Sequence, residues 1–177
     1  MWLSLIGFMA CGKSTVAREL GEHALLAVHD LDAEVEAAAG RSVARIFAED
    51  GEAVFRDREL AALKRLPPEE DLVLACGGGL VEQPEARRLL RDRGAVVWLD
   101  TPWEVLLRRL EEEPPGRRPL LDRGWDAVEA MLRARLPLYA RTGHFRLRSD
   151  LAAPRELVSR VLDAKLRWER RRDREAP

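Results

Sequence analysis

A glycine-rich stretch near the N-terminus carries the residue types that bind nucleotide phosphates. Residues 7–15, GFMACGKST, follow an apolar run and precede a helical pattern, which is the context that the P-loop pattern G-x-x-x-x-G-K-[ST] requires. Gly7 and Gly12 allow backbone conformations in which successive N–H groups point at phosphate oxygens. Lys13 can reach the outer phosphates, and the hydroxyl of Ser14 can ligate Mg²⁺. The alternative is a glycine-rich turn with a solvated lysine, but the complete pattern in this context favours nucleotide binding.

Two further clusters follow apolar runs, so they fall at the carboxyl ends of predicted strands, the edge at which open α/β sheets bind ligands. Asp30 and Asp32 come after residues 24–29, ALLAVH, which predict a buried strand. Taken alone, Asp32 could equally be the N-cap of the helix at 33–39, and Asp30 a turn residue. Residues 77–79 are three glycines after the run LVLAC, and they either let a ligand approach the backbone or form a flexible turn.

Arginines stand where they could bind anions. Arg56 lies in a predicted helix, and its plain interpretation is a surface charge paired with Glu52 or Glu59. Residues 113–124, EPPGRRPLLDRG, have no periodicity, and a loop of this length predicts a mobile lid. Arg118 on this lid is either an exposed charge or a group that closes over phosphates.

Apolar spacing predicts the elements that position these residues. The expected strands cover residues 2–6, 24–29, 72–76, 95–99 and 145–148. The expected helices cover residues 15–22, 33–39, 43–49, 51–65, 84–93, 103–112, 125–136 and 154–168, and a charged tail at 170–177 is expected to be disordered. We therefore predict an α/β fold, a single P-loop domain over residues 1–177 with three α/β/α layers and a five-stranded parallel sheet.

Composition excludes several classes of protein. Net charge is −1, so no global field attracts nucleic acid or a membrane surface. No apolar run approaches the ~20 residues that cross a bilayer, and the first residues enter a strand without a basic leader. Two cysteines are too few for a disulfide framework. We expect a cytoplasmic protein with no nucleic-acid or membrane partner.

Taken together, the motifs resemble the shikimate kinase family over residues 3–139. The matching marks are the P-loop, Asp30-x-Asp32 with Glu36, Gly51-Glu52 with Phe55-Arg56 and Glu59, the three glycines at 77–79, Arg118-Pro119-Leu120-Leu121, and Arg135-x-Pro137-Leu138-Tyr139. Their fixed order is far more specific than a P-loop alone.

The resemblance implies transfer of the γ-phosphoryl group of ATP to the 3-hydroxyl of shikimate, with Mg²⁺, by a monomer with substrate-binding helices and a lid. The implied catalytic residues are Lys13, Asp32 and Arg118. The implied ATP-binding residues are Gly7, Ala10, Cys11, Gly12, Lys13, Ser14, Thr15, Arg109 and Arg118. The implied shikimate-binding residues are Asp32, Arg56, Gly77, Gly78, Gly79 and Arg135, and the implied metal ligands are Ser14 and Asp30.

The chain departs from the family pattern at two places. The family usually has glycine where Ala10 stands, and commonly a hydroxyl residue just before the three glycines, where this chain has Ala75-Cys76. Two other functions stay open at this point: a related P-loop kinase for another polyol acid such as gluconate, and a noncatalytic ATP-binding regulatory module. The presence of Lys13, Asp32 and Arg118 together argues against the second.

Overall fold

Parallel strands form a five-stranded sheet in the computed structural model, which describes residues 1–114 and 119–175. The strands are β1 (Trp2–Ile6), β2 (Ala27–Asp30), β3 (Leu72–Ala75), β4 (Gly94–Asp100) and β5 (Phe145–Arg148). Their order is β2-β3-β1-β4-β5, and all neighbours pair in parallel, which confirms the predicted α/β fold.

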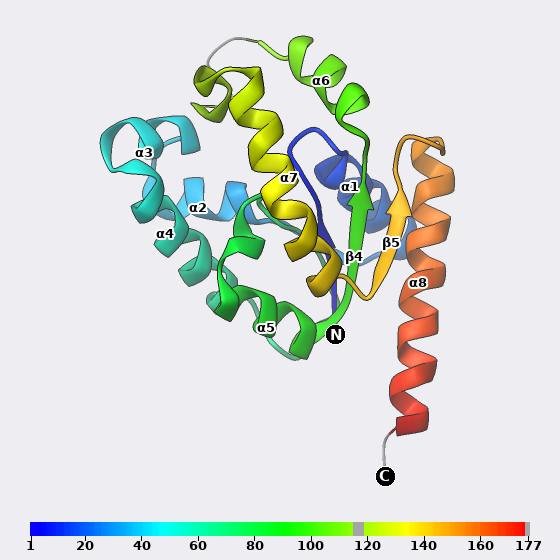
Figure 1. Ribbon diagram of the computed structural model, residues 1–177. Helices are drawn as coiled ribbons and strands as arrows, with labels where there is room; N and C mark the ends of the chain where they lie inside the picture. Colours follow the sequence, from blue (N-terminus) through cyan, green and yellow to red (C-terminus); the bar gives the residue numbers. More distant parts are fainter. Residues whose placement is uncertain (115–118, 176–177) are drawn as a thin grey trace.

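Helices connect the strands and cover both faces of the sheet. They are α1 (Lys13–Ala24), α2 (Leu31–Ala39), α3 (Val43–Glu49), α4 (Gly51–Arg65), α5 (Pro84–Arg93), α6 (Trp103–Glu111), α7 (Trp125–Thr142) and α8 (Pro154–Glu175), with 3₁₀ turns η1 (Leu80–Glu82) and η2 (Pro119–Arg123). Figure 1 shows α5 and α7 in front of the sheet and α1 behind it, where α1 packs against α8. Helices α2, α3 and α4 form a lobe beside the sheet (Figure 1). Among the helices of the described residues, none combines the length and apolarity that crossing a bilayer requires.

The sheet is buried at its centre and exposed at the β2 edge. All five residues of β1 are buried, as expected for a central parallel strand covered on both faces. The prediction of a buried second strand was wrong, because Val28 on β2 is 42% exposed. An edge strand has a neighbour on one side only, and its apolar letters resemble those of a central strand.

Two helices extend beyond their predicted ends. Helix α7 continues through Pro137 to Thr142, although proline removes one helical hydrogen bond. Buried side chains on both sides of Pro137, including Leu132 and Tyr139, hold the two halves in one helix. Helix α8 continues through the charged tail to Glu175, where Arg171 lies over the ring of Phe145 at 6.0 Å. Only residues 176–177 of the tail lie outside the described chain at this end.

Candidate active site

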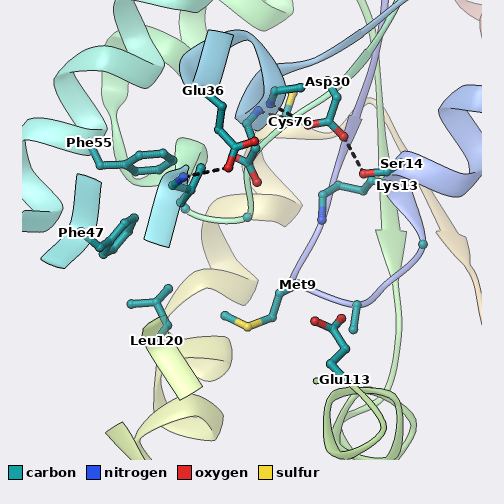
Figure 2. A pocket seen from close by; sticks show the side chains of 18 of the residues that line it. Met9, Lys13, Ser14, Asp30, Glu36, Phe47, Phe55, Cys76, Glu113 and Leu120 are labelled. Carbon is teal, nitrogen blue, oxygen red and sulfur yellow. Dashed lines mark hydrogen bonds between the residues drawn. The ribbon is translucent and has the colours of Figure 1, made fainter. Parts of the chain in front are cut away.

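A cavity of about 660 Å³ opens at the carboxyl ends of β1, β2 and β3. Figure 2 shows Lys13 and Ser14 of α1 on one side of it and Phe47 and Phe55 on the opposite side. Thirteen of the predicted site residues line it: Ala10, Gly12, Lys13, Ser14, Thr15, Asp30, Asp32, Arg56, Gly77, Gly78, Gly79, Arg109 and Arg135. Cys76, next to the glycines, lines it as well. Residues from six separate segments of the chain therefore meet in one place.

The P-loop leaves the positive end of α1 open to the cavity. Gly12 stands at the N-cap with φ 100°, and no side chain caps the helix, so the first N–H groups are available to an anion. The Nζ atom of Lys13 donates to the carbonyl oxygens of Gly7 at 2.9 Å and of Phe8 at 2.8 Å. These contacts hold the ammonium group against the loop where phosphates would bind.

Three predicted nucleotide residues shape the loop itself. A Cβ atom on Gly7 would lie 2.5 Å from the carbonyl oxygen of Leu99, so only glycine is accommodated there. Ala10 has φ 59°, in the left-handed region, and its carbonyl oxygen accepts from Nη1 of Arg109 at 3.0 Å. Cys11 is buried, with its sulfur 3.6 Å from Nζ of Lys13. Gly7 and Cys11 do not line the cavity in this form and support the loop from behind.

The two predicted metal ligands are joined by a hydrogen bond. Ser14 donates through Oγ to Oδ2 of Asp30 at 2.7 Å (Figure 2). Oδ1 of Asp30 accepts from the backbone N–H of Asp32 at 3.1 Å, which makes Asp30 the N-cap of α2. The interpretation of Asp32 as the N-cap is therefore wrong, because the helix begins two residues earlier and Asp30 caps it. Asp32 lies in the first turn of α2 with its side chain at the cavity.

Arg56 is held by the two glutamates that its helix offers. Its Nη1 donates to Glu59 at 2.9 Å and its Nη2 to Glu52 at 3.1 Å. The pairing matches the surface-charge interpretation, but the location does not, because the side chain of Arg56 is 14% exposed and that of Glu59 is fully buried. A Cβ atom on Gly79 would lie 2.2 Å from Nη2 of Arg56, so this glycine makes room for the guanidinium group.

Glu59 is a buried carboxyl group that was predicted as a partner of Arg56 but not as a site residue. Burial raises the pKa of its carboxyl group to about 7, against the opposing effect of Arg56, and Asp32 and Arg135 also lie close enough to influence it. A Cβ atom on Gly77 would lie 1.9 Å from Oε1 of Glu59. The spacing of Arg56 and Glu59 predicted that they form an ion pair, but nothing in the sequence indicated that this pair is buried.

Arg135 reaches the same cavity from α7. Its side chain is 2% exposed, and its guanidinium carbon lies over the ring of Phe8 at 5.8 Å. Within the described part of the chain, the Nε groups of Arg56 and Arg135 are both buried without a hydrogen-bond partner. Two largely buried guanidinium groups that line one cavity are suited to binding a planar carboxylate.

The predicted lid is described only in part. Arg118, expected to act on phosphates, lies outside the described residues. On either side of the gap, Glu113 and Leu120 line the cavity. Arg123 donates to Glu52 at 2.8 Å, which ties η2 to α4. The described flanks of the lid therefore border the cavity.

The site combines a phosphate-binding loop with oxygen atoms that can ligate a metal ion. Among residues 1–114 and 119–175, three or more His, Cys, Asp or Glu side chains nowhere gather as a metal cluster. The Ser14–Asp30 pair supplies two oxygen atoms beside the P-loop, and Mg²⁺ commonly uses few protein ligands together with water and phosphate oxygens. The donor set therefore fits Mg²⁺ bound with a nucleotide.

Comparison with known proteins agrees with this site. A family model described as shikimate kinase matches residues 9–165. The chain is 39% identical over 166 residues to shikimate kinase of Symbiobacterium thermophilum, covering 92% of this chain and 95% of the relative. The solved structure of shikimate kinase from Acinetobacter baumannii in complex with shikimate has a TM-score of 0.87 at 36% identity, covering 93% of this chain and 92% of that one. The structure of the Aquifex aeolicus enzyme has a TM-score of 0.81 at 35% identity, covering 93% and 95%.

Proposed function

The chain belongs to the shikimate kinase family and is an ATP-dependent phosphotransferase, and from this premise we propose how its residues transfer the γ-phosphoryl group of ATP to the 3-hydroxyl of shikimate. The observation that carries the proposal is the pair of buried arginines. Arg56 and Arg135 come from different helices, are largely buried and line one cavity. Such a pair binds the ring carboxylate of shikimate and orients the ring toward the P-loop.

ATP binds across the P-loop on the other side of the cavity. The N–H groups at the start of α1 and the ammonium group of Lys13 bind its phosphates. Ser14 and Asp30 hold Mg²⁺, directly or through water, and the ion when bound offsets charge on the phosphates. Arg109, already hydrogen-bonded to Ala10 of the loop, lies against the adenine.

Asp32 acts on the attacking hydroxyl group. It lies at the cavity between the P-loop and the Arg56–Glu59 pair, where a carboxylate can orient the 3-hydroxyl and accept its proton. The remaining catalysis is positioning and charge stabilisation, as is usual for phosphoryl transfer. Arg118, carried by the lid, adds positive charge to the transferring phosphoryl group when the lid closes.

The enzyme is further proposed to work as a monomeric single domain in the cytoplasm, the compartment that supplies ATP. The P-loop, Asp32 and both substrate arginines lie on one chain, as a monomeric enzyme requires. Light scattering on a sizing column measures this directly: a mass near 20.1 kDa agrees with a monomer, and twice that mass contradicts it.

A side-by-side assay tests the proposed reaction. ADP release is measured with shikimate, gluconate and a nucleoside monophosphate at equal concentrations. We expect turnover with shikimate at least ~100-fold above the other two, because neither of the others matches a carboxylated ring between two arginines. Equal or faster turnover with gluconate would assign the chain to the other carboxylated substrate.

The arginine pair has its own test within that assay. Arg56→Ala is expected to raise the KM for shikimate at least tenfold and to leave the KM for ATP near its normal value, because one charge-assisted contact to the carboxylate is lost. Arg65→Ala is the matched control, since Arg65 is an exposed residue at the end of the same helix. An unchanged KM for shikimate in Arg56→Ala would leave Arg56 without a substrate role.

A further inference from the structure

A turn directly after the three glycines contacts both substrate arginines. In this turn, η1, Glu82 accepts a hydrogen bond through Oε2 from Nη2 of Arg135 at 3.0 Å. The next residue, Gln83, donates through Nε2 to the backbone carbonyl oxygen of Arg56 at 3.1 Å. One short segment therefore contacts the arginines of α4 and α7.

Hydrogen bonds on both sides hold this turn in place. Its backbone is closed by hydrogen bonds from Glu82 to Gly79 at 2.9 Å and from Gln83 to Leu80 at 3.1 Å. Arg87 of α5 donates to the carbonyl oxygen of Val81 at 2.6 Å, which fixes the turn from the other side. Contacts to such a turn limit the positions that a side chain can take.

Glu82 is placed to act on Arg135 and on nothing else in the site. The side chain of Glu82 is 42% exposed and does not line the cavity, whereas that of Arg135 is 2% exposed and does. Glu82 therefore holds Nη2 of Arg135 from outside the cavity, while the guanidinium group itself belongs to a residue that lines the cavity. The ring of Phe8 lies against the guanidinium group, so its rotation is restricted on two sides.

We infer that Glu82 is a positioning residue for substrate binding: it fixes the guanidinium group of Arg135 in the orientation that receives the substrate carboxylate. This inference rests on the proposed role of Arg135. An ordinary half-exposed ion pair would contribute only slightly to stability and would not alter substrate affinity. The two roles therefore differ in what a substitution changes.

Kinetics of Glu82 variants distinguish the roles. Glu82→Ala is expected to raise the KM for shikimate about tenfold, the effect of losing one charge-assisted hydrogen bond, while kcat and the KM for ATP stay within about twofold. Glu82→Gln keeps an acceptor oxygen and is expected to restore the KM for shikimate to within about threefold of normal. Thermal unfolding of each variant checks that the fold is intact.

Glu85→Ala is the control, because Glu85 is a neighbouring half-exposed carboxylate whose 2.7 Å partner is Lys64, remote from substrate groups. The inference is overturned if Glu82→Ala has the same KM for shikimate as the normal enzyme and as Glu85→Ala. Arg135→Ala separates this failure from failure of the proposed function. A raised KM in Arg135→Ala with a normal KM in Glu82→Ala would remove Glu82 alone, whereas absence of any turnover with shikimate would remove the proposed function itself.

Discussion

Asp32 is the single residue on which the chemical step depends most directly. Asp32→Asn keeps the size of the side chain and removes its ability to accept a proton, so we expect kcat to fall about 100-fold or more. ATP should bind with normal affinity, because the P-loop is untouched. Steady-state kinetics and a nucleotide-binding titration measure the two quantities. An unchanged kcat would mean that Asp32 only binds the ring hydroxyls and takes no part in proton transfer.

The glycines at 77–79 are needed less for their backbone freedom than for the space that they leave to charged side chains. A methyl group on Gly79 would overlap the guanidinium group of Arg56, while a methyl group on Gly78 would first meet the backbone nitrogen of Met9 at an ordinary 3.4 Å. Gly79→Ala should therefore displace Arg56 and raise the KM for shikimate about tenfold or more. Gly78→Ala should raise it less. Equal effects of the two substitutions would contradict this explanation.

At the scale of elements, helix α1 ends at a residue whose left-handed backbone conformation is unfavourable for a side chain larger than glycine. Leu25 is the C-cap of α1 with φ 53° and a side chain that is 92% exposed. Glycine adopts this conformation without the penalty that a Cβ atom brings, whereas leucine gains almost nothing from burial here. Leu25→Gly is therefore expected to raise the free energy of unfolding by roughly 0.5–1 kcal/mol and to leave activity unchanged.

Urea unfolding of Leu25→Gly and Leu25→Ala measures this effect. Alanine keeps the Cβ atom, so Leu25→Ala should have nearly the same stability as the normal chain. A gain in both variants would point to the exposed leucine side chain as the cause, and a gain in neither would contradict the backbone explanation.

Sequence reasoning succeeded where local rules decide the structure. The P-loop, the five strands and the helix of residues 84–93 follow from apolar spacing and from the positions of glycine and proline. It failed where tertiary packing decides. Pro137 suggested a helix end, yet buried side chains on both sides of it continue α7. The tail suggested disorder, yet contacts such as Arg171 over Phe145 support a helix.

The candidate site was predictable to the same extent. Motif order indicated which segments meet, but the depth of the Arg56–Glu59 pair and the contact from Glu82 to Arg135 depend on side chains far apart in the chain. Glu82 shares no spacing rule with Arg135, 53 residues later, so no pattern could have joined them.

At the scale of the whole molecule, buried titratable groups make stability depend on pH. Burial raises the pKa of Glu59 from its ordinary 4.5 to about 7, so the folded state keeps a proton between these pH values that the unfolded state has lost. Stability falls with pH wherever the folded state binds more protons. Glu59 therefore lowers the free energy of unfolding as pH rises from 4.5 to about 7, with no further change above that.

His144 acts in the opposite direction over an overlapping range. Burial and Arg91 lower its pKa from 6.5 to about 4, so the unfolded state binds more protons between these values and stability rises with pH. The contributions of Glu59 and His144 to the free energy of unfolding change in opposite directions with pH and partly cancel. The stability of the normal protein measured against pH would therefore reveal neither contribution by itself. A difference between two proteins that share His144 removes its contribution.

Glu59→Gln provides that difference, since glutamine can still accept a hydrogen bond from Arg56 and cannot titrate. The free energy of unfolding of Glu59→Gln minus that of the normal protein should grow as pH rises from about 4.5 to about 7 and then stay constant. Urea unfolding at half-unit pH steps measures it. A difference that is flat across this range would show that Glu59 titrates at or below its ordinary pKa in the folded state, so that Arg56 offsets or outweighs its burial. A difference that shrinks with rising pH below 4.5 would then mean that Arg56 dominates and lowers the pKa of Glu59.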